Sequence, residues 1–217
     1  MLNLKLIKRG DFLRVLCLGA HSDDIEIGCG GTILKLIGQY KNINFHWVVF
    51  SSNKKRKGEA TNSAYAFLSG AGNQTIIIKE FKDGFFPYAG GKIKNYFELL
   101  KRKVDPELIF THHRLDLHQD HRLISDLTWN TFRDHLIFEY EIPKNDADLG
   151  APNVFIHLDD ATCKKKVQYI QKFYISQAKN QWFTEETFRA ILRLRGIESN
   201  SATQYAEGFY CRKLALF

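Results

Sequence analysis

The segment from Ala20 to Thr32, AHSDDIEIGCGGT, constrains the fold of this chain more than any other. Residues 14–19 before it form a continuous apolar run that ends in glycine, which is typical of a short buried strand. Residues 32–40 after it place three aliphatic side chains on one helical face. Because open α/β sheets carry their sites where a strand feeds a helix, the intervening loop over residues 20–31 is predicted to be functional.

One imidazole and two adjacent carboxylates, those of His21, Asp23 and Asp24, give this loop its chemistry. A simpler interpretation is a helix N-cap by Ser22 or Asp23 beside a surface histidine. Capping accounts for one acid only and leaves His21 and the second acid unexplained, so we favour a functional site.

Strands and helices alternate along the chain at spacings typical of an α/β fold. Apolar runs predict strands at 45–50, 74–79, 107–111 and 136–142 and an extended piece at 153–157. Periodic patterns predict helices at 59–68, 92–103, 119–134, 161–175, 184–194 and 202–206, with a loop at 51–58. We expect a mostly parallel sheet with helices on both faces.

The composition indicates a single domain over residues 1–217, with a core over about 1–142 and a C-terminal elaboration over about 143–217 that closes the site. Tyr205 and Glu207 are the residues expected to close it. No apolar run is long enough to span a bilayer. The four cysteines are scattered without a CxxC pair, which indicates reduced thiols in a cytoplasmic protein.

The net charge of +7 raises the question of an anionic partner such as nucleic acid. The only dense basic run, Lys54–Lys57, is short, and the other lysines are spread along the chain. The basic residues also lack interleaved aromatic side chains. Nucleic-acid binding is therefore not expected.

A second cluster of polar side chains follows the strand at 107–111, where residues 111–122 hold four histidines and two aspartates. If a helix starts near residue 119, His118 and His121 face the same way. Asp116 and Asp120 are then available to orient imidazoles. The alternative is a solvated helix start, but a second such cluster at a strand end favours a site.

The residue types in the two clusters indicate a metal. Two histidines and one aspartate without cysteine fit zinc in a catalytic site, with three protein ligands and an open position for water. The neighbouring aspartate is then free to act as a base. HExxH, the phosphate-binding GxxxxGK[ST] loop and the dinucleotide-binding GxGxxG are all absent from the sequence.

The two clusters resemble the motifs of the LmbE-like, PIG-L-type family of N-acetylglucosaminyl deacetylases. Residues 20–32 fit the family pattern A-H-[PAS]-D-D-x-E-[IL]-G-x-G-G-T, and residues 116–121 fit D-x-H-x-D-H. Weaker matches are Arg56 with Glu59, PNVF at 152–155, Ser176-Gln177 and YAEGF at 205–209. Ser22 replaces the commoner proline, and Ile25 stands where many members carry glutamate.

This resemblance implies a Rossmann-like three-layer fold and a zinc hydrolase that cleaves the acetamide of an amino sugar. It implies that His21, Asp24 and His121 are the zinc ligands and that Asp23 is the general base. It also implies that His118 is the electrophile or acid and that Asp120 holds a histidine. Arg56 and Glu59 are the implied substrate contacts.

The expected function is therefore zinc-dependent removal of an N-acetyl group from an amino sugar or its conjugate. Two alternatives stay open, a zinc amidase that acts on another small conjugate and a non-catalytic sugar-binding module. Another divalent metal could replace zinc, and the chain could form a homo-oligomer. Intact candidates for the base and the ligands, Asp23, His21, Asp24 and His121, argue against a silent module.

Overall fold

Seven strands form one sheet in the computed structural model, which describes residues 13–40 and 42–215. The strand order is β3-β2-β1-β4-β5-β7-β6; the first five strands pair in parallel, and β7 is antiparallel to β5 and β6. The strands are β1 (Leu13–Gly19), β2 (Ile43–Val49), β3 (Asn73–Ile78), β4 (Leu108–His112), β5 (Leu136–Tyr140), β6 (Val154–Leu158) and β7 (Tyr205–Tyr210). The predicted α/β fold with a mostly parallel sheet is confirmed.

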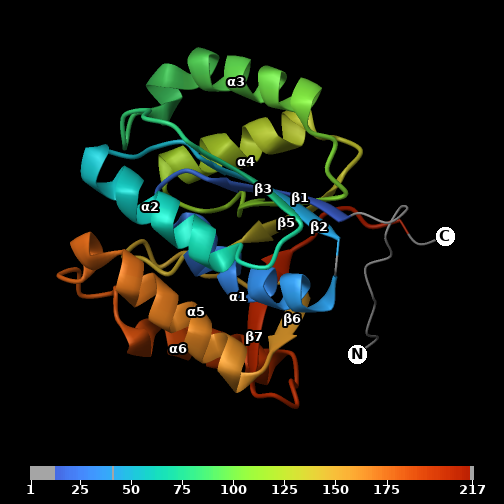
Figure 1. Cartoon of the computed structure of the whole chain (residues 1–217), viewed down its shortest axis with the longest axis vertical. Coiled ribbons are helices and arrows are strands. Elements are labelled where there is room, and N and C mark those ends of the chain that lie inside the picture. Colours follow the sequence, from blue (N-terminus) through green and yellow to red (C-terminus); the bar gives the residue numbers. More distant parts are fainter. Residues whose placement is uncertain (1–12, 41, 216–217) are drawn as a thin grey trace.

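Helices cover both faces of this sheet, as Figure 1 shows. On one face lie α1 (Asp24–Gln39), α2 (Lys54–Phe67), α5 (Asp160–Phe173) and α6 (Glu185–Glu198). On the other lie α3 (Gly90–Lys103) and α4 (Gln119–Thr131). Two short 3₁₀ helices, η1 (Phe86–Ala89) and η2 (Ile175–Gln177), lie in connections. No helix of the described residues is both long and apolar enough to cross a membrane.

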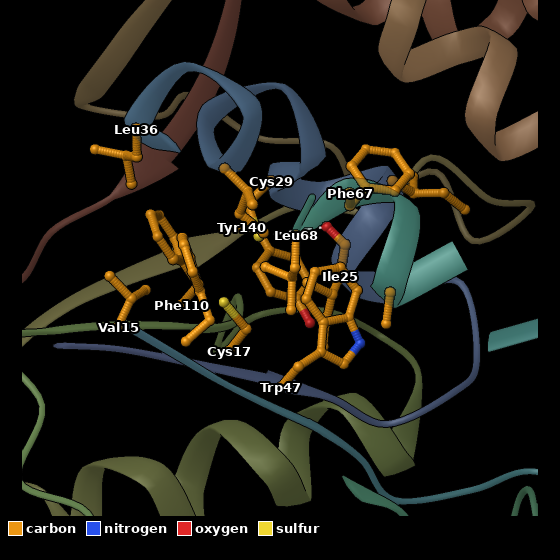
Figure 2. Packing of buried hydrophobic residues seen from close by; sticks show 14 of the residues in the cluster. Val15, Cys17, Ile25, Cys29, Leu36, Trp47, Phe67, Leu68, Phe110 and Tyr140 are labelled. Carbon is orange, nitrogen blue, oxygen red and sulfur yellow. Dashed lines mark hydrogen bonds between the residues drawn. The ribbon is translucent and has the colours of Figure 1, made fainter. Parts of the chain in front are cut away.

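The continuous apolar run in β1 divides between two cores, because successive side chains of a strand point to opposite faces. Val15 and Cys17 belong to the cluster beneath α1 and α2, whereas Leu16 and Leu18 belong to the cluster beneath α3 and α4. Figure 2 shows the first cluster, in which Trp47 lies close to residues of α1 and α2. A strand buried on both faces has no polar alternation, and this explains its sequence.

Helix α1 begins at Asp24, so the predicted loop over residues 20–31 was wrong beyond residue 23. Its glycines serve close packing inside a helix instead of loop flexibility. A Cβ atom at Gly28 would lie 2.2 Å from the ring of Tyr140, and one at Gly31 would lie 2.4 Å from Leu158. Helix α2 likewise starts at Lys54, within the predicted loop, because the Asn53 side chain caps it.

The predicted helix at 202–206 was also wrong, since Tyr205 begins strand β7. The Glu207 carboxylate is buried against α1, where it accepts hydrogen bonds from the backbone N–H groups of Gly31 and Thr32. It also pairs with the buried Lys166 at 2.6 Å. Glu207 therefore supports the middle of α1 and does not close the site. The division of the chain near residue 142 stays a prediction, although β6 and β7 join the same sheet as β1–β5.

The sheet has a topological switch point between β1 and β4. From β1 the chain moves through β2 to β3 on one side, and it then returns to place β4 and β5 on the other. Loops that leave two neighbouring parallel strands in opposite directions open a crevice at the carboxyl ends of those strands. Both polar clusters of the sequence lie at this point.

Near the carboxyl end of β1, a buried carboxyl group links α1 to the residue that follows α5. Tyr174 has one hydroxyl proton and donates it to the carbonyl oxygen of Ser22. Glu26 Oε1 lies 2.5 Å from the same hydroxyl oxygen, so Glu26 must itself supply the proton for that hydrogen bond. Burial raises the pKa of Glu26 to about 8, which agrees with a protonated side chain at neutral pH.

We expect this carboxyl group to make the metal-free protein less stable as the pH rises. Above pH 4.5 the unfolded chain loses the Glu26 proton while the folded chain keeps it up to about pH 8. Stability is therefore fully present below pH 4.5 and falls between these values, by on the order of 5 kcal/mol. Glu26→Gln keeps a donor toward Tyr174 and should remove this part of the pH dependence.

Urea unfolding at pH 5 and pH 8 measures the effect in both proteins. Glu98→Gln, at a glutamate on α3 that pairs with Lys94, is the matched control and should behave as the wild type. An equal loss of stability in wild type and Glu26→Gln would contradict a buried, protonated Glu26.

Candidate metal centre and active site

The ends of β1 and β4 bring the two polar clusters of the sequence into one site. The backbone N–H of Ala20, just after β1, donates to His112 Nε2 at the end of β4 over 3.0 Å. The candidate residues lie just before and within the first turns of the helices that follow these two strands. They are His21, Asp23 and Asp24 before and within α1, and His118, Asp120 and His121 before and within α4.

Three donor atoms form a compact triangle in this site. His21 Nδ1 lies 3.1 Å from His121 Nε2 and 3.4 Å from Asp24 Oδ2, and His121 Nε2 lies 3.6 Å from Asp24 Oδ2. Zinc–nitrogen bonds of 2.0–2.1 Å in tetrahedral geometry separate neighbouring ligand atoms by about 3.4 Å. The set of two histidines and one aspartate implied by the family resemblance therefore fits a zinc ion.

Carboxylates behind the two histidines select which ring nitrogen can face a metal. Asp116 Oδ2 accepts a hydrogen bond from His121 Nδ1 at 2.9 Å, which leaves Nε2 of that ring as the ligand atom. Asp120 Oδ2 and Asp83 Oδ1 lie 3.3 and 3.0 Å from His21 Nε2, which leaves its Nδ1 for the metal. Asp116 and Asp120 thus face imidazoles, where they can orient the rings as the sequence analysis expected.

The adjacent aspartates differ sharply in their surroundings. Burial raises the pKa of Asp23, the charge of Asp24 raises it further, and the Arg56 guanidinium opposes both. Burial acts on Asp24 in the same direction, but the charges of His121, His112 and His21 outweigh it and hold the pKa of Asp24 well below its usual range. Two carboxyl groups whose environments separate their pKa values are suited to different roles, an anionic ligand and a proton acceptor.

Arg56 and Glu59, both on α2, are placed differently. The Arg56 guanidinium donates to Asp23 Oδ1 at 2.6 Å, so it contacts the candidate base directly. The Glu59 carboxylate accepts hydrogen bonds from the backbone N–H and the hydroxyl group of Ser176, at 3.0 and 2.5 Å, and this ties α2 to η2. Their role as substrate contacts stays a prediction.

His118 is the N-cap of α4, where its Nδ1 accepts from the backbone N–H of Asp120. The ring proton is then on Nε2. Burial and the charge of His21 lower the pKa of His118, so the neutral form is favoured in the ligand-free protein. His118 can therefore donate a hydrogen bond from Nε2 without being protonated on both nitrogens.

Two residues of the site were missed by our sequence analysis. His112 is fully buried, its Nε2 lies 3.1 Å from Asp24 Oδ2, and its ring stacks on His121 with centroids 3.9 Å apart. Asp83 lies in the loop after β3 and reaches His21. Their position directly at or after a parallel strand was the available signal, since such ends share one edge of the sheet.

A family model described as "PIG-L: GlcNAc-PI de-N-acetylase" matches residues 16–132, more than half of the chain. The chain belongs to the PIG-L family. The matched residues contain both polar clusters and all the candidate ligands. The resemblance seen in the sequence motifs is thereby confirmed.

Solved structures share the fold. The N,N'-diacetylchitobiose deacetylase from Pyrococcus horikoshii is 20% identical, with a TM-score of 0.68 over 91% of this chain and 83% of its own. A conserved protein from Thermus thermophilus is 19% identical, with a TM-score of 0.71 over 94% of this chain and 97% of its own. GalB, the 4-carboxy-2-hydroxymuconate hydratase from Pseudomonas putida, is 18% identical, with a TM-score of 0.71 over 94% of this chain and 98% of its own. Because these proteins include a hydratase, the function of this chain must be argued from its site.

We expect the purified chain to bind about one zinc ion. Burial lowers the pKa of His21, but the charge of Asp24 and hydrogen bonds with Asp120, Asp24 and Asp83 outweigh it and raise the pKa well above its ordinary value. This histidine must lose its proton to bind metal, so zinc affinity should increase as the pH rises.

Competition with a chromogenic chelator at pH 6 and pH 8 measures this affinity. His121→Gln should lose most of it, whereas His157→Gln, at a histidine on β6, should not. Equal zinc binding by the two variants would contradict the ligand assignment.

Proposed function

We propose that this chain is a zinc-dependent N-deacetylase that releases acetate from an N-acetylated amino sugar or its conjugate. The observation that carries the proposal is the contrast between two neighbouring acids beside the donor triangle. Asp24 faces three histidines, whereas Asp23 faces Arg56 and has a raised pKa. Hydrolysis of an amide needs both a metal ligand and a separate base, and this pair offers one of each.

In this proposal His21, Asp24 and His121 hold the zinc. When bound, zinc supplies a Lewis acid that polarises the acetyl carbonyl and makes the attacking water more acidic. Asp23 accepts the proton of that water, with its carboxylate held in place by Arg56. The raised pKa of Asp23 suits a group that must take a proton and later release it.

His118 stabilises the charge that develops on the acetyl oxygen. Its Nδ1 is occupied as a helix cap, so its Nε2–H is the donor available to the crevice. A proton must then reach the departing amine. Asp23, which carries the proton taken from water, can deliver it.

The substrate class rests on the family and on the polar rim of the site. The matching family model is described as a GlcNAc-PI de-N-acetylase. Arg56 and Asp83 place a guanidinium and a carboxylate next to the candidate base and ligands, where they can bind sugar hydroxyl groups. We therefore infer an N-acetylglucosamine-type amide as the substrate.

A free-amine release assay tests this function on a panel of N-acetylhexosamine conjugates with the zinc-loaded protein. Asp23→Asn keeps shape but removes the base, so it should retain zinc and lose about 10²–10⁴ of the rate. Asp24→Asn replaces an anionic ligand by a neutral one, so zinc affinity and activity should fall together and excess zinc should partly restore activity. The reverse pattern would mean that the two aspartates have exchanged roles, and no amine release from any conjugate would contradict the proposal.

Arg56→Ala should change both substrate affinity and the pH dependence of the reaction. The guanidinium lowers the pKa of Asp23, so its loss should raise that pKa. The acidic limb of the kcat/KM profile, where the base becomes protonated, should then move to higher pH by about one unit. Zinc content should stay normal.

Lys57→Ala is the matched control, because Lys57 lies in the same basic run but pairs with Glu80 at 2.8 Å. Its pH profile should equal that of the wild type. A rise in KM for Arg56→Ala without a shift of the acidic limb would show a substrate contact alone.

A further inference from the structure

Asp116 connects the candidate ligand His121 to a lysine from the C-terminal part of the chain. The Asp116 side chain is buried, and its Oδ1 accepts the backbone N–H of His118 at 2.8 Å. Its Oδ2 lies 2.9 Å from His121 Nδ1 and 3.1 Å from Lys144 Nζ. One carboxylate oxygen therefore contacts both the imidazole and the ammonium group.

A second carboxylate anchors this ammonium group. Lys144 forms an ion pair with Asp148, whose side chain is also buried, and Asp148 Oδ2 accepts the backbone N–H of Leu117 at 2.8 Å. The contacts close a ring from Lys144 to Asp116, along the chain to Leu117, and through Asp148 back to Lys144. The loop that leaves β5 is thus fastened to the segment that carries His118 and leads into α4.

This closed set of contacts fixes the Asp116 carboxylate in the orientation that His121 requires. An acceptor at Nδ1 keeps the proton of the neutral ring on that nitrogen and leaves the Nε2 lone pair for a metal. Without the ammonium group, the carboxylates of Asp116 and Asp148 would lose the cation that both contact. Repulsion would then turn Asp116 away from His121.

We propose that Lys144 is a positioning residue of the metal centre, which holds Asp116 so that His121 presents Nε2 to the metal. Lys144 pairs with Asp116 and Asp148, and it acts on His121 through the Asp116 carboxylate. The proposal rests on the metal ligands assigned under the proposed function. It gives the segment after β5 a direct role in metal affinity.

Zinc affinity of the metal-free chain, measured by chelator competition, tests this role. Removal of the outer partner of a metal-binding histidine typically weakens metal affinity 10–100-fold, so Lys144→Met should weaken zinc binding by about 10-fold or more. Lys144→Arg keeps the charge and should bind zinc more tightly than Lys144→Met. Lys94→Met, which removes an ion pair with Glu98 on α3, is the matched control and should bind as the wild type.

The ring nitrogen shifts of His121 in the metal-free protein give a second readout, which a loss of general stability would not change. The wild type should show the proton on Nδ1, and Lys144→Met should show a mixture of both tautomers. If Lys144→Met does not fold, Lys144→Gln decides, because it also removes the ammonium charge and should weaken zinc binding in the same direction. Wild-type zinc affinity and tautomer in the folded Lys144→Met protein, or wild-type affinity in Lys144→Gln, would overturn the proposal.

His121→Gln separates this inference from the proposed function. If that variant binds zinc as well as the wild type, the ligand assignment itself fails, and the role of Lys144 falls with it. If His121→Gln loses zinc while Lys144→Met keeps full affinity, only the role of Lys144 is wrong.

Discussion

The parallel pairing of β1 with β4 is the contact on which the site depends. Cys17 lies opposite Phe110 in this register, so the residues that follow the two strands emerge next to each other. The pairing joins parts of the chain that are about ninety residues apart, and apolar side chains on both faces of β1 stabilise it. Two helices then start near neighbouring strand ends, and each brings its first turn of polar side chains to the same edge of the sheet.

The burial of so many charged groups at one point is costly unless each has a partner. Asp24 and Asp120 are almost fully buried, and both have partners: Asp24 lies among histidines, and Asp120 accepts the backbone N–H groups of Gly84 and Phe86. Burial raises the pKa of Glu26 to about 8, so Glu26 meets the cost by keeping its proton. The site is therefore organised electrostatically before any ligand binds, which is the arrangement that catalysis by fixed charges requires.

The last third of the chain holds the N-terminal half in place. Glu207 of β7 and Lys166 of α5 bind the middle of α1, where Lys166 Nζ donates to the carbonyl oxygen of Ile27 at 2.7 Å. Tyr174 binds the segment just before α1, and Lys144 fastens the segment before α4. These contacts come from β7, from α5 and the residue after it, and from the loop after β5, and together they restrain both helices that carry candidate ligands.

The sequence by itself determined the order of strands and helices as far as α6, the edge of the sheet that carries the candidate site and the residue types of the candidate metal centre. Those features follow from apolar periodicity and from motifs of neighbouring residues, which are local. Only the tertiary structure decided that Asp23 meets Arg56 while Asp24 meets the histidines, that His112 and Asp83 join the site, and that Glu207 lies behind α1. Such contacts depend on the direction in which each side chain leaves its element and on what packs against it from distant parts of the chain. The same reason explains two errors of the sequence prediction. The glycines within residues 24–31 suggested a loop, but they are packing positions inside a helix. Residues 205–210 form a strand because they pair with β5 and β6, which local sequence does not reveal.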